Sequence, residues 1–548
     1  MPNKNTAEVL VECLEAHGVE YIFGVPGEEN LVFLEAIRKS KITFIVTRHE
    51  QAAAFMAAIF GRMTGKVGVA LSTLGPGATN LLTGVAYAQL GGFPLLVITG
   101  QKAFKNNKQG KFQIVDIVAM MKPITKFSAT ITSGKMVQDM VVKAINQAES
   151  ERKGAAHLEL PEDIAKEICD DISINPSITS EVKYQVAKEK DIKKALKEIE
   201  ESKHPIIILG RGANNKSISK ELELFIKKTS IPFISTQMGK GACDENSLLY
   251  IGTTALSAGD FAHLALQHAD TLIFIGHDVV EKPPFVLDTK SEKKIIHINF
   301  FTSSAKDVYV PTHEVVGDIS NTLSVLTEKI KINPAWDFSR FLEIRDILRK
   351  DIVKFSQSLD FPLRPERVVG DINKILPKDG ILALDNGMYK LWIARNFFTK
   401  EPNGILLDNA LATMGAGLPS GIALKILYPK RKVLVVTGDG GIMMSISELE
   451  TAVRLKLDLV VLILDDAGLG MIRWKQKNMN FSSFGLSFNN PDFVTLAESF
   501  GAIGHKVGKI EELALFLEKA FNSKGVHVIA CPINYDEANK VLGKIKNI

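Results

Sequence analysis

The chain of 548 residues is long enough for roughly three or four domains. Hydrophobic residues make up 46% of it and charged residues 23%, which excludes a disordered or low-complexity chain. The net charge of +4, from 66 basic and 62 acidic residues, provides no large field of one sign, so neither nucleic acid nor a membrane is an expected partner.

The amino-terminal stretch MPNKNTAEVLVECLEAHG begins with polar residues and continues as an amphipathic helix, without the apolar core of a signal peptide. The most apolar window, LLTGVAYAQLGGFPLLVITG, is interrupted by Gly-Gly-Phe-Pro and indicates a helix, a turn and a strand rather than a membrane span. The four cysteines lie too far apart for metal-ligand spacing or a disulfide framework. We therefore expect a cytoplasmic protein.

Three blocks of the chain alternate apolar strands with helical patterns, which predicts α/β architecture with three doubly wound parallel sheets. The first block, residues 1–180, contains YIFGV, KITFIV, VGVALST and PLLVITG, and the linker DISINPSITSEVKYQ follows it. The second, residues 190–340, contains HPIIILGRGAN, IPFIST, DTLIFIGHD and KKIIHINF. After the charged helical stretch FSRFLEIRDILRKDIVKFSQSLD, the third block, residues 360–548, contains GILALDNG, KVLVVTGDGG, DLVVLILDD and HVIACP. The first and third blocks look alike at this level.

Two of these strands end in glycine-rich turns. GDGG occupies residues 438–441 and GPGATN residues 75–80. At the carboxyl end of a parallel strand, glycine allows the backbone to approach a phosphate, and the next helix offers its first N–H groups. Each turn alone is equally compatible with a simple strand-to-helix connection.

A second acidic turn follows GDGG after one more helix and strand. Residues 441–464 lead to Asp465 and Asp466, which precede the glycine-bearing AGLGM. A strand–helix–strand unit places the ends of its two strands side by side, so Asp439 and one of this pair can share a cation. Magnesium takes carboxylate, carbonyl and phosphate oxygens as ligands. The pattern therefore predicts a metal–diphosphate site.

GDG, followed after a helix and a strand by a pair usually written Asn-Asn or Asn-Asp, is the signature of thiamine diphosphate enzymes, which this chain resembles. Together with residues 47–100, it makes the chain similar over essentially its whole length to acetolactate synthases, also called acetohydroxyacid synthases. Further matching blocks are GVPGEEN, KFQIVD, HLELPEDI, MGAGLPSGIALK and GMIRW.

The resemblance implies a pyrimidine-binding, a central and a diphosphate-binding domain for the three blocks in order. It implies thiamine diphosphate and Mg²⁺ as cofactors and pyruvate as substrate, with other 2-oxo acids as further candidates. Because the cofactor of such enzymes spans two subunits, it also implies at least a homodimer and favours a homotetramer.

Glu50 is the first catalytic residue that the resemblance implies. In the family, a carboxylic acid bound to the aminopyrimidine ring keeps a proton in reserve, and the apolar run QAAAFMAAIF after Glu50 is expected to favour the protonated form by desolvation. The alternative is an ordinary carboxylate in the first turn of a helix, where negative charge is favoured. His49 either orients substrate or caps this helix.

Other site residues also rest on the resemblance. Phe112 and Gln113 match catalytic-site residues that face the thiazolium ring and the substrate, although a surface loop leading into a helix is the alternative. The implied metal ligands are Asp439, Asp466 and the backbone oxygen of Gly468. The implied cofactor-binding residues are Pro26, Glu50, Gly387, Met388, Met414 (the apolar side chain beneath the bent cofactor), Asp439, Gly440, Gly441, Leu469 and Gly470.

Several departures bear on the branch of the family. GHDVVEKPPF stands where biosynthetic members carry an Arg-Phe-Asp-Asp-Arg run, and NGMYK, residues 386–390, where they carry glutamine and histidine. The catabolic, FAD-independent branch is therefore closer, and FAD stays open without being favoured. Lys475 occupies the position of a family tryptophan, which has moved to Trp474, and this argues against 2-oxobutyrate as acceptor. Phe112 and AGLGM match biosynthetic members instead.

The expected reaction condenses two pyruvate molecules to 2-acetolactate with release of CO2. Another thiamine diphosphate-dependent 2-oxo acid decarboxylase, carboligase or pyruvate oxidase is the alternative, although the paired histidines of such decarboxylases do not occur in the chain. A non-catalytic homologue acting as an interaction subunit is disfavoured because Glu50, Asp439 and Asp466 are all retained.

Overall fold

The computed structural model describes residues 4–103, 105, 111–169, 184–256, 260–278, 280–281, 292–303 and 309–536. The chain divides into two compact units. Unit 1 comprises Met1–Lys183, Leu411–Pro429 and Ser445–Leu457, and unit 2 comprises Tyr184–Ala410, Lys430–Met444 and Asp458–Ile548. Two short segments of the third block thus pack with the first block.

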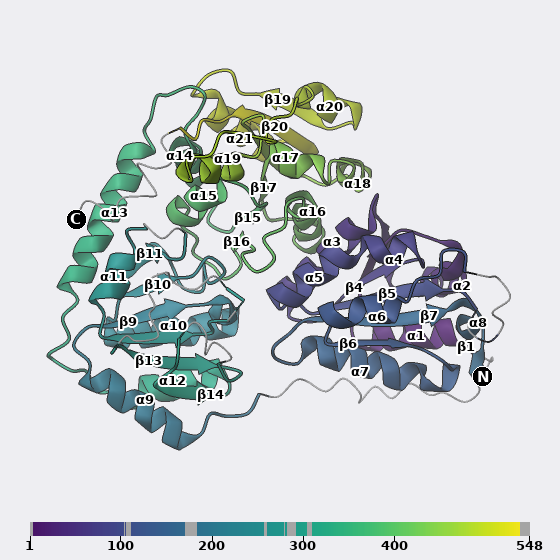
Figure 1. Cartoon of the computed structure of the whole chain (residues 1–548), viewed down its shortest axis with the longest axis horizontal. Coiled ribbons are helices and arrows are strands. Elements are labelled where there is room, and N and C mark those ends of the chain that lie inside the picture. Colours follow the sequence, from purple (N-terminus) through teal and green to yellow (C-terminus); the bar gives the residue numbers. More distant parts are fainter. Residues whose placement is uncertain are drawn as a thin grey trace. The chain divides into compact units, whose positions relative to one another are not determined.

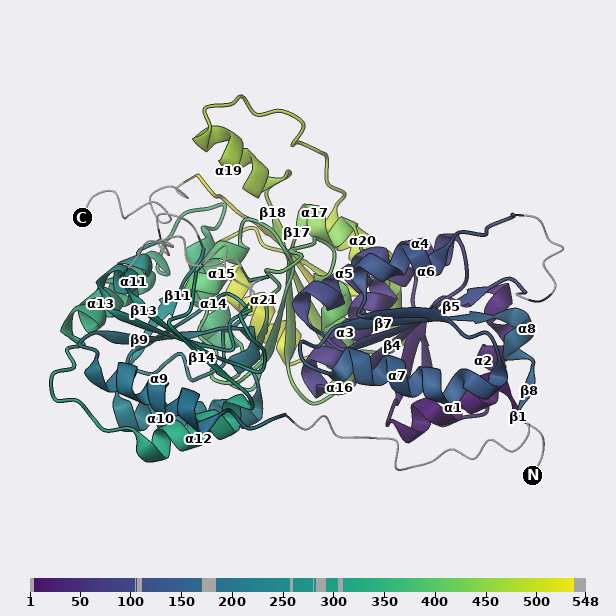
Figure 2. The same ribbon diagram turned by 60° about the horizontal axis from the view of Figure 1, so that its bottom comes forward.

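The main sheet of unit 1 has six parallel strands in the order β3-β2-β4-β5-β7-β6. Their side chains alternate between the two faces, so that Val69 and Leu71 of β4 pack with α1 and α7, whereas α3 and α5 belong to the other face (Figure 2). The bounds are β2 Tyr21–Gly24, β3 Thr43–Val46, β4 Gly68–Ser72, β5 Leu95–Gln101, β6 Phe127–Thr130, β7 Ala155–Pro161, α1 Thr6–Ala16, α3 Glu50–Thr64, α5 Leu82–Gly91 and α7 Val137–Glu149.

The two later segments of unit 1 form helices. α16, Gly417–Leu427, packs against α3, and α18 spans Glu448–Arg454. α3 is rich in alanine and buried over most of its length, which allows the close approach of a second helix. A two-stranded antiparallel sheet pairs β1, Lys4–Asn5, with β8, Ile168–Cys169.

The central sheet lies in unit 2 and has the parallel order β11-β10-β9-β12-β13-β14. Alternate residues of β9 and β12 face α9, α10 and α12 on one side and α11 and α13 on the other (Figure 1). The bounds are β9 Pro205–Leu209, β10 Phe233–Ser235, β11 Tyr250–Thr253, β12 Thr271–Ile275, β13 Lys294–Asn299, β14 His313–Val316, α9 Glu189–Glu201, α10 Lys216–Thr229, α11 His263–His268, α12 Ile319–Lys329 and α13 Ser339–Phe355.

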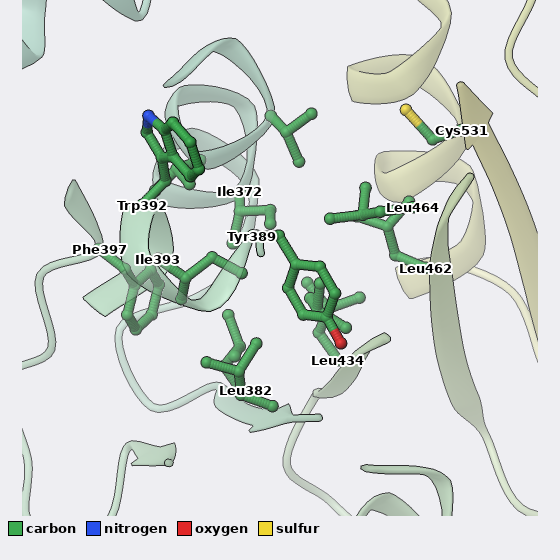
Figure 3. Close-up of a cluster of buried hydrophobic side chains, with 14 of the residues drawn as sticks. Ile372, Leu382, Tyr389, Trp392, Ile393, Phe397, Leu434, Leu462, Leu464 and Cys531 are labelled. Atoms are coloured by element: carbon green, nitrogen blue, oxygen red, sulfur yellow. The ribbon is translucent and has the colours of Figure 1, made fainter. Parts of the chain in front are cut away.

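The third sheet, also in unit 2, has the parallel order β16-β15-β17-β18-β20-β19. One face is covered by α14, α15 and α21, and Figure 3 shows Tyr389 beside Leu434, with Trp392 towards Ile372 and Ile393. The bounds are β15 Ile381–Leu384, β16 Ile405–Leu406, β17 Val433–Gly438, β18 Leu459–Asp465, β19 Ile503–Lys506, β20 Val526–Pro532, α14 Pro365–Ile375, α15 Lys390–Asn396, α20 Phe493–Ser499 and α21 Glu512–Phe521.

The prediction of three parallel sheets flanked by helices is confirmed. Every apolar segment named above as a strand forms one, and the charged stretch after residue 337 forms α13. The first and third sheets also share one topology, with strands in the order 2-1-3-4-6-5 counted along the chain. The linker DISINPSITSEVKYQ falls largely outside the described residues, and so does half of the motif GHDVVEKPPF.

Two further features follow from the described part of the chain. None of its helices combines the length and the apolar character that crossing a membrane requires. All four cysteines, Cys13, Cys169, Cys243 and Cys531, are buried and free. Burial raises the pKa of the Cys13 and Cys243 thiols to about 12.

Candidate functional site

GDGG forms the predicted turn at the end of β17. Asp439 is 2% exposed and begins the short helix α17, Asp439–Met443. Its Oδ1 accepts the N–H of Gly440 at 2.8 Å, and its Oδ2 accepts the N–H of Gly468 at 3.3 Å. The second of these bonds joins GDGG to the turn that follows β18, as the strand–helix–strand argument predicts.

Asp466 lies beside Asp439 at the end of β18. Burial, and then the neighbouring carboxylate of Asp439, raises the pKa of Asp466 to about 7, against the opposing effect of Arg473, whose Nη1 lies 3.1 Å from Asp466 Oδ2. Burial also raises the pKa of Asp439. The two carboxyl groups therefore lie close together and partly shielded from water, where a bound cation would stabilise their charged forms.

Asn490 is a member of this site that the sequence did not indicate. Its Nδ2 donates to Asp439 Oδ2 and to Asp465 Oδ1, both at 2.8 Å. The loop that carries Asn490 returns to the acidic turn, because Gly468 forms a β-bridge with Ser487 and Leu469 N–H donates to Leu486 O at 3.2 Å. Asn490 thus ties the two acidic turns together.

The loop Asn386–Lys390 reaches the same turns from the end of β15. Tyr389 Oη accepts the N–H of Gly438 at 2.9 Å, and Lys390 Nζ donates to Asn386 Oδ1 at 2.8 Å. A Cβ atom on Gly470 would lie 2.8 Å from Asp466 Oδ2 and 3.5 Å from Met388 Cβ. The lack of a side chain at Gly470 therefore allows the start of α19 (Gly470–Asn478) to lie close to Asp466 and to the loop that carries Met388. Gly387, Met388, Asp439, Gly440, Gly441, Asp466, Gly468, Leu469 and Gly470 are thereby brought to one edge of the sheet.

The donor set fits a hard cation bound together with a diphosphate. Among the described residues there is no group of three or more His, Cys, Asp or Glu side chains that would hold a metal without help. Two carboxylates and a glycine-bearing turn instead leave ligand positions for backbone and phosphate oxygens, which is the set that Mg²⁺ accepts.

Unit 1 carries the second group of site residues around Glu50. Glu50 is buried at the start of α3, and its Oε2 accepts Asn80 Nδ2 at 3.0 Å. A Cβ atom on Gly77 would lie 3.2 Å from Glu50 Oε1, so a side chain at residue 77 would crowd the Glu50 carboxyl group. GPGATN, which forms α4 (Pro76–Asn80), therefore packs on the predicted catalytic acid.

Gln113 and the turn of Pro26 approach the same loop. A Cβ atom on Gly75 would lie 2.7 Å from Gln113 O, and Thr73 Oγ1 donates to Glu29 Oε2, three residues after Pro26, at 2.6 Å. Phe112 is 71% exposed, so its ring does not contribute to the core of unit 1. Met414 lies before α16 in the segment Leu411–Pro429 of unit 1.

His49 caps the helix that Glu50 begins. Its Nδ1 accepts the N–H of Gln51 at 3.1 Å, and its backbone is extended, as an N-cap residue requires. This geometry supports the capping alternative for His49.

Comparison with known proteins gives three consecutive domain matches. Residues 4–120 match the N-terminal TPP binding domain of thiamine pyrophosphate enzymes, residues 192–326 their central domain and residues 385–531 their C-terminal TPP binding domain. These matches define the class of the protein as a thiamine pyrophosphate enzyme.

Relatives extend the match over nearly the whole chain. An acetolactate synthase of Bacillus subtilis is 30% identical over 534 residues, covering 97% of this chain and 93% of the relative. A catabolic acetolactate synthase of Raoultella terrigena is 32% identical, covering 98% and 97%, and a probable acetolactate synthase large subunit of Methanocaldococcus jannaschii is 33% identical, covering 99% and 94%. The chain belongs to the acetolactate synthase family, and the predicted resemblance is confirmed.

Proposed function

We propose that the protein condenses two pyruvate molecules to 2-acetolactate and CO2, with thiamine diphosphate and Mg²⁺ as cofactors. One carbon–carbon bond breaks to release CO2, another forms to the carbonyl carbon of the second pyruvate, and one proton is taken up. The observation that carries this proposal is that two neighbouring turns of unit 2 hold the buried Asp439 and the part-buried Asp466, while unit 1 carries a separate buried acid, Glu50.

Bound thiamine diphosphate supplies the electron sink for decarboxylation. Asp439, Asp466 and the backbone oxygen of Gly468 hold Mg²⁺, while Gly387, Met388, Gly440, Gly441, Leu469 and Gly470 surround the diphosphate. Glu50 holds a proton at its carboxyl group, and the amide of Asn80 orients that group. We assign Pro26 and Met414 to cofactor contacts and Phe112 and Gln113 to contacts with substrate.

Trp474 and Lys475 support pyruvate as the acceptor. Trp474 packs against the core of the third sheet, and Lys475 is exposed at the surface of α19, Gly470–Asn478. Trp474 is therefore engaged in packing, and a lysine stands at the position of the family tryptophan. We further propose that the enzyme works without FAD in the cytoplasm, as a homodimer or homotetramer in which Glu50 serves the cofactor of a neighbouring subunit.

The test is an incubation of the purified protein with pyruvate, thiamine diphosphate and Mg²⁺, with and without FAD. We expect acetoin after acid treatment only, at the same level without FAD, and no acetaldehyde. Acetaldehyde would identify a decarboxylase and hydrogen peroxide an oxidase, whereas acetolactate formed only with FAD would overturn the FAD-independent part of the proposal.

Glu50→Gln separates the catalytic proposal from a cofactor-binding homologue. The amide keeps the shape of the side chain but cannot hold the acid proton, so product formation should fall by about 100-fold or more, as expected for an acid–base residue. Circular dichroism checks that the fold is retained. Unchanged turnover in the folded variant would contradict the role of Glu50.

A further inference from the structure

Glu448 is a buried carboxylate that none of the assigned roles uses. It is 0% exposed and begins α18 in unit 1. Its Oε1 accepts the N–H of Arg48 at 2.9 Å and the N–H of His49 at 3.1 Å, and its Oε2 accepts Thr451 Oγ1 at 2.7 Å. Among the described residues, the donors to this carboxylate are all neutral groups.

The two backbone donors immediately precede Glu50. His49 is the N-cap of α3, and its carbonyl oxygen also accepts Thr47 Oγ1 at 3.1 Å and the N–H of Ala53 at 3.2 Å. Glu448 therefore binds the turn at the point where the direction of α3, and with it the position of Glu50, is set.

A second bond fixes the same turn from the other end of α18. Arg454 Nη2 donates to Val46 O at 2.6 Å, and Arg454 Nε is held by Glu450 Oε1 at 2.9 Å. Residues 46, 48 and 49 are thus attached to both ends of one short helix. A turn attached at two places has less freedom than one held by its own bonds alone.

We propose that Glu448 is a positioning residue for Glu50, holding the start of α3 so that the Glu50 carboxyl group stays against Gly77 and Asn80. This inference rests on the proposed role of Glu50. A carboxylate suits the task because its bonds to backbone N–H groups are stronger than those of a neutral acceptor.

The direct test is amide hydrogen exchange of the purified full-length protein without added cofactor. In Glu448→Ala, the peptide that covers residues 46–52 should exchange at least about tenfold faster than in the wild type, because two N–H groups lose their acceptor. Glu366→Ala is the matched control, since Glu366 is only 2% exposed and accepts Trp392 Nε1 at 3.1 Å, but lies in unit 2.

Activity measurements then separate positioning from general stability. Glu448→Ala should lower kcat by about 10- to 100-fold, as expected for misplacement of a catalytic group by up to about 1 Å, with half-saturation by thiamine diphosphate changed less than about twofold. Glu448→Gln should recover most of kcat and of the protection, because the amide oxygen can accept both N–H groups and its NH₂ group can donate to Thr451.

Three results would overturn the proposal. They are unchanged exchange at residues 46–52 in Glu448→Ala, faster exchange there with normal kcat, and a Glu448→Gln variant that is normally protected but as inactive as the alanine variant. Should Glu448→Ala not fold, Thr451→Val replaces it, with a smaller increase in exchange expected and no increase overturning the proposal. A wild-type protein that forms no acetolactate would refute the proposed function and leave the exchange result interpretable.

Discussion

The first and third sheets have the same strand order, but they use the turn after their third strand differently. In the third sheet that turn is GDGG, which carries its own carboxylate, Asp439. In the first sheet it is GPGATN, which has no charge and instead receives Glu50 from the helix after the second strand.

This difference separates two kinds of acid chemistry. Asp439 lies beside Asp466, an arrangement that favours a bound cation. Glu50 lies against the Asn80 amide and Gly77, which orient a single carboxyl group for the acid–base role proposed for it. The same strand order thus serves cation binding in the third sheet and acid–base chemistry in the first. The reason is that the carboxylate comes from the turn itself in the third sheet and from a neighbouring helix in the first.

The largest effect is expected at the carboxylate that only the third sheet carries. Asp439→Ala removes a proposed Mg²⁺ ligand, so kcat/KM for pyruvate should fall by more than about 100-fold. Loss of a residue that only supports a metal ligand already lowers metal affinity or activity by about 10- to 100-fold. Steady-state kinetics over a range of Mg²⁺ concentrations measure this. Full activity at ordinary Mg²⁺ would contradict the metal assignment.

Asn490→Ala tests the side chain that joins the two acidic turns. Loss of its bonds to Asp439 and Asp465 should weaken Mg²⁺ affinity by about 10- to 100-fold, with a smaller effect on kcat at saturating Mg²⁺. Isothermal titration with Mg²⁺ in the presence of thiamine diphosphate provides the readout. Asn489→Ala changes the exposed neighbouring residue, and this variant should bind Mg²⁺ with the affinity of the wild type.

A matched pair of glycine substitutions sharpens the comparison. A Cβ atom on Gly77 would lie 3.0 Å from Thr73 Cγ2 and 3.2 Å from Glu50 Oε1, whereas one on Gly441 would lie 2.9 Å from Asp385 Oδ2 and 3.0 Å from Thr437 Oγ1. Gly77→Ala should therefore lower kcat by about tenfold through a shift of Glu50. Gly441→Ala should chiefly raise the half-saturation constant for thiamine diphosphate. The same kinetic pattern in both variants would refute the division of tasks.

The smallest effect concerns acid stability of the first sheet. Burial lowers the pKa of His157 to about 3, while its ring bonds Thr99 Oγ1 at 2.9 Å and Ser128 Oγ at 2.8 Å. Between pH 6.5 and pH 3 the unfolded chain binds a proton that the folded chain does not, so stability falls as the pH is lowered, by up to about 1.4 kcal/mol per pH unit.

His157→Gln should flatten this dependence, with some loss of stability at pH 7. Denaturant unfolding of wild type and variant at several pH values between 4 and 7 measures the slopes. Parallel slopes would show that other groups cause the acid sensitivity.

The sequence predicted the parts of the fold in which local pattern and tertiary structure agree. Long apolar strands such as β5 and β18, and the two acidic turns, follow from patterns within about thirty residues. The short strands β11, β14 and β16 were not predicted, because two to four residues at or near a sheet edge carry little pattern.

Long-range partners were not predictable either. Asn490 belongs to a loop with no signal of its own, and Glu448 contacts a turn 400 residues earlier in the chain. The domain boundaries at residues 180, 190, 340 and 360 stay predictions, as do the ligand roles of the site residues.

The reactivity of the buried cysteines reports the order in which the two units unfold. Cys13 and Cys169 lie in unit 1, Cys243 and Cys531 in unit 2. Because an inaccessible thiol hardly reacts, each should be labelled by an alkylating reagent only after its own surroundings open. Mapping the labelled cysteines along a denaturant series would therefore reveal which unit loses its structure first, without any engineered probe.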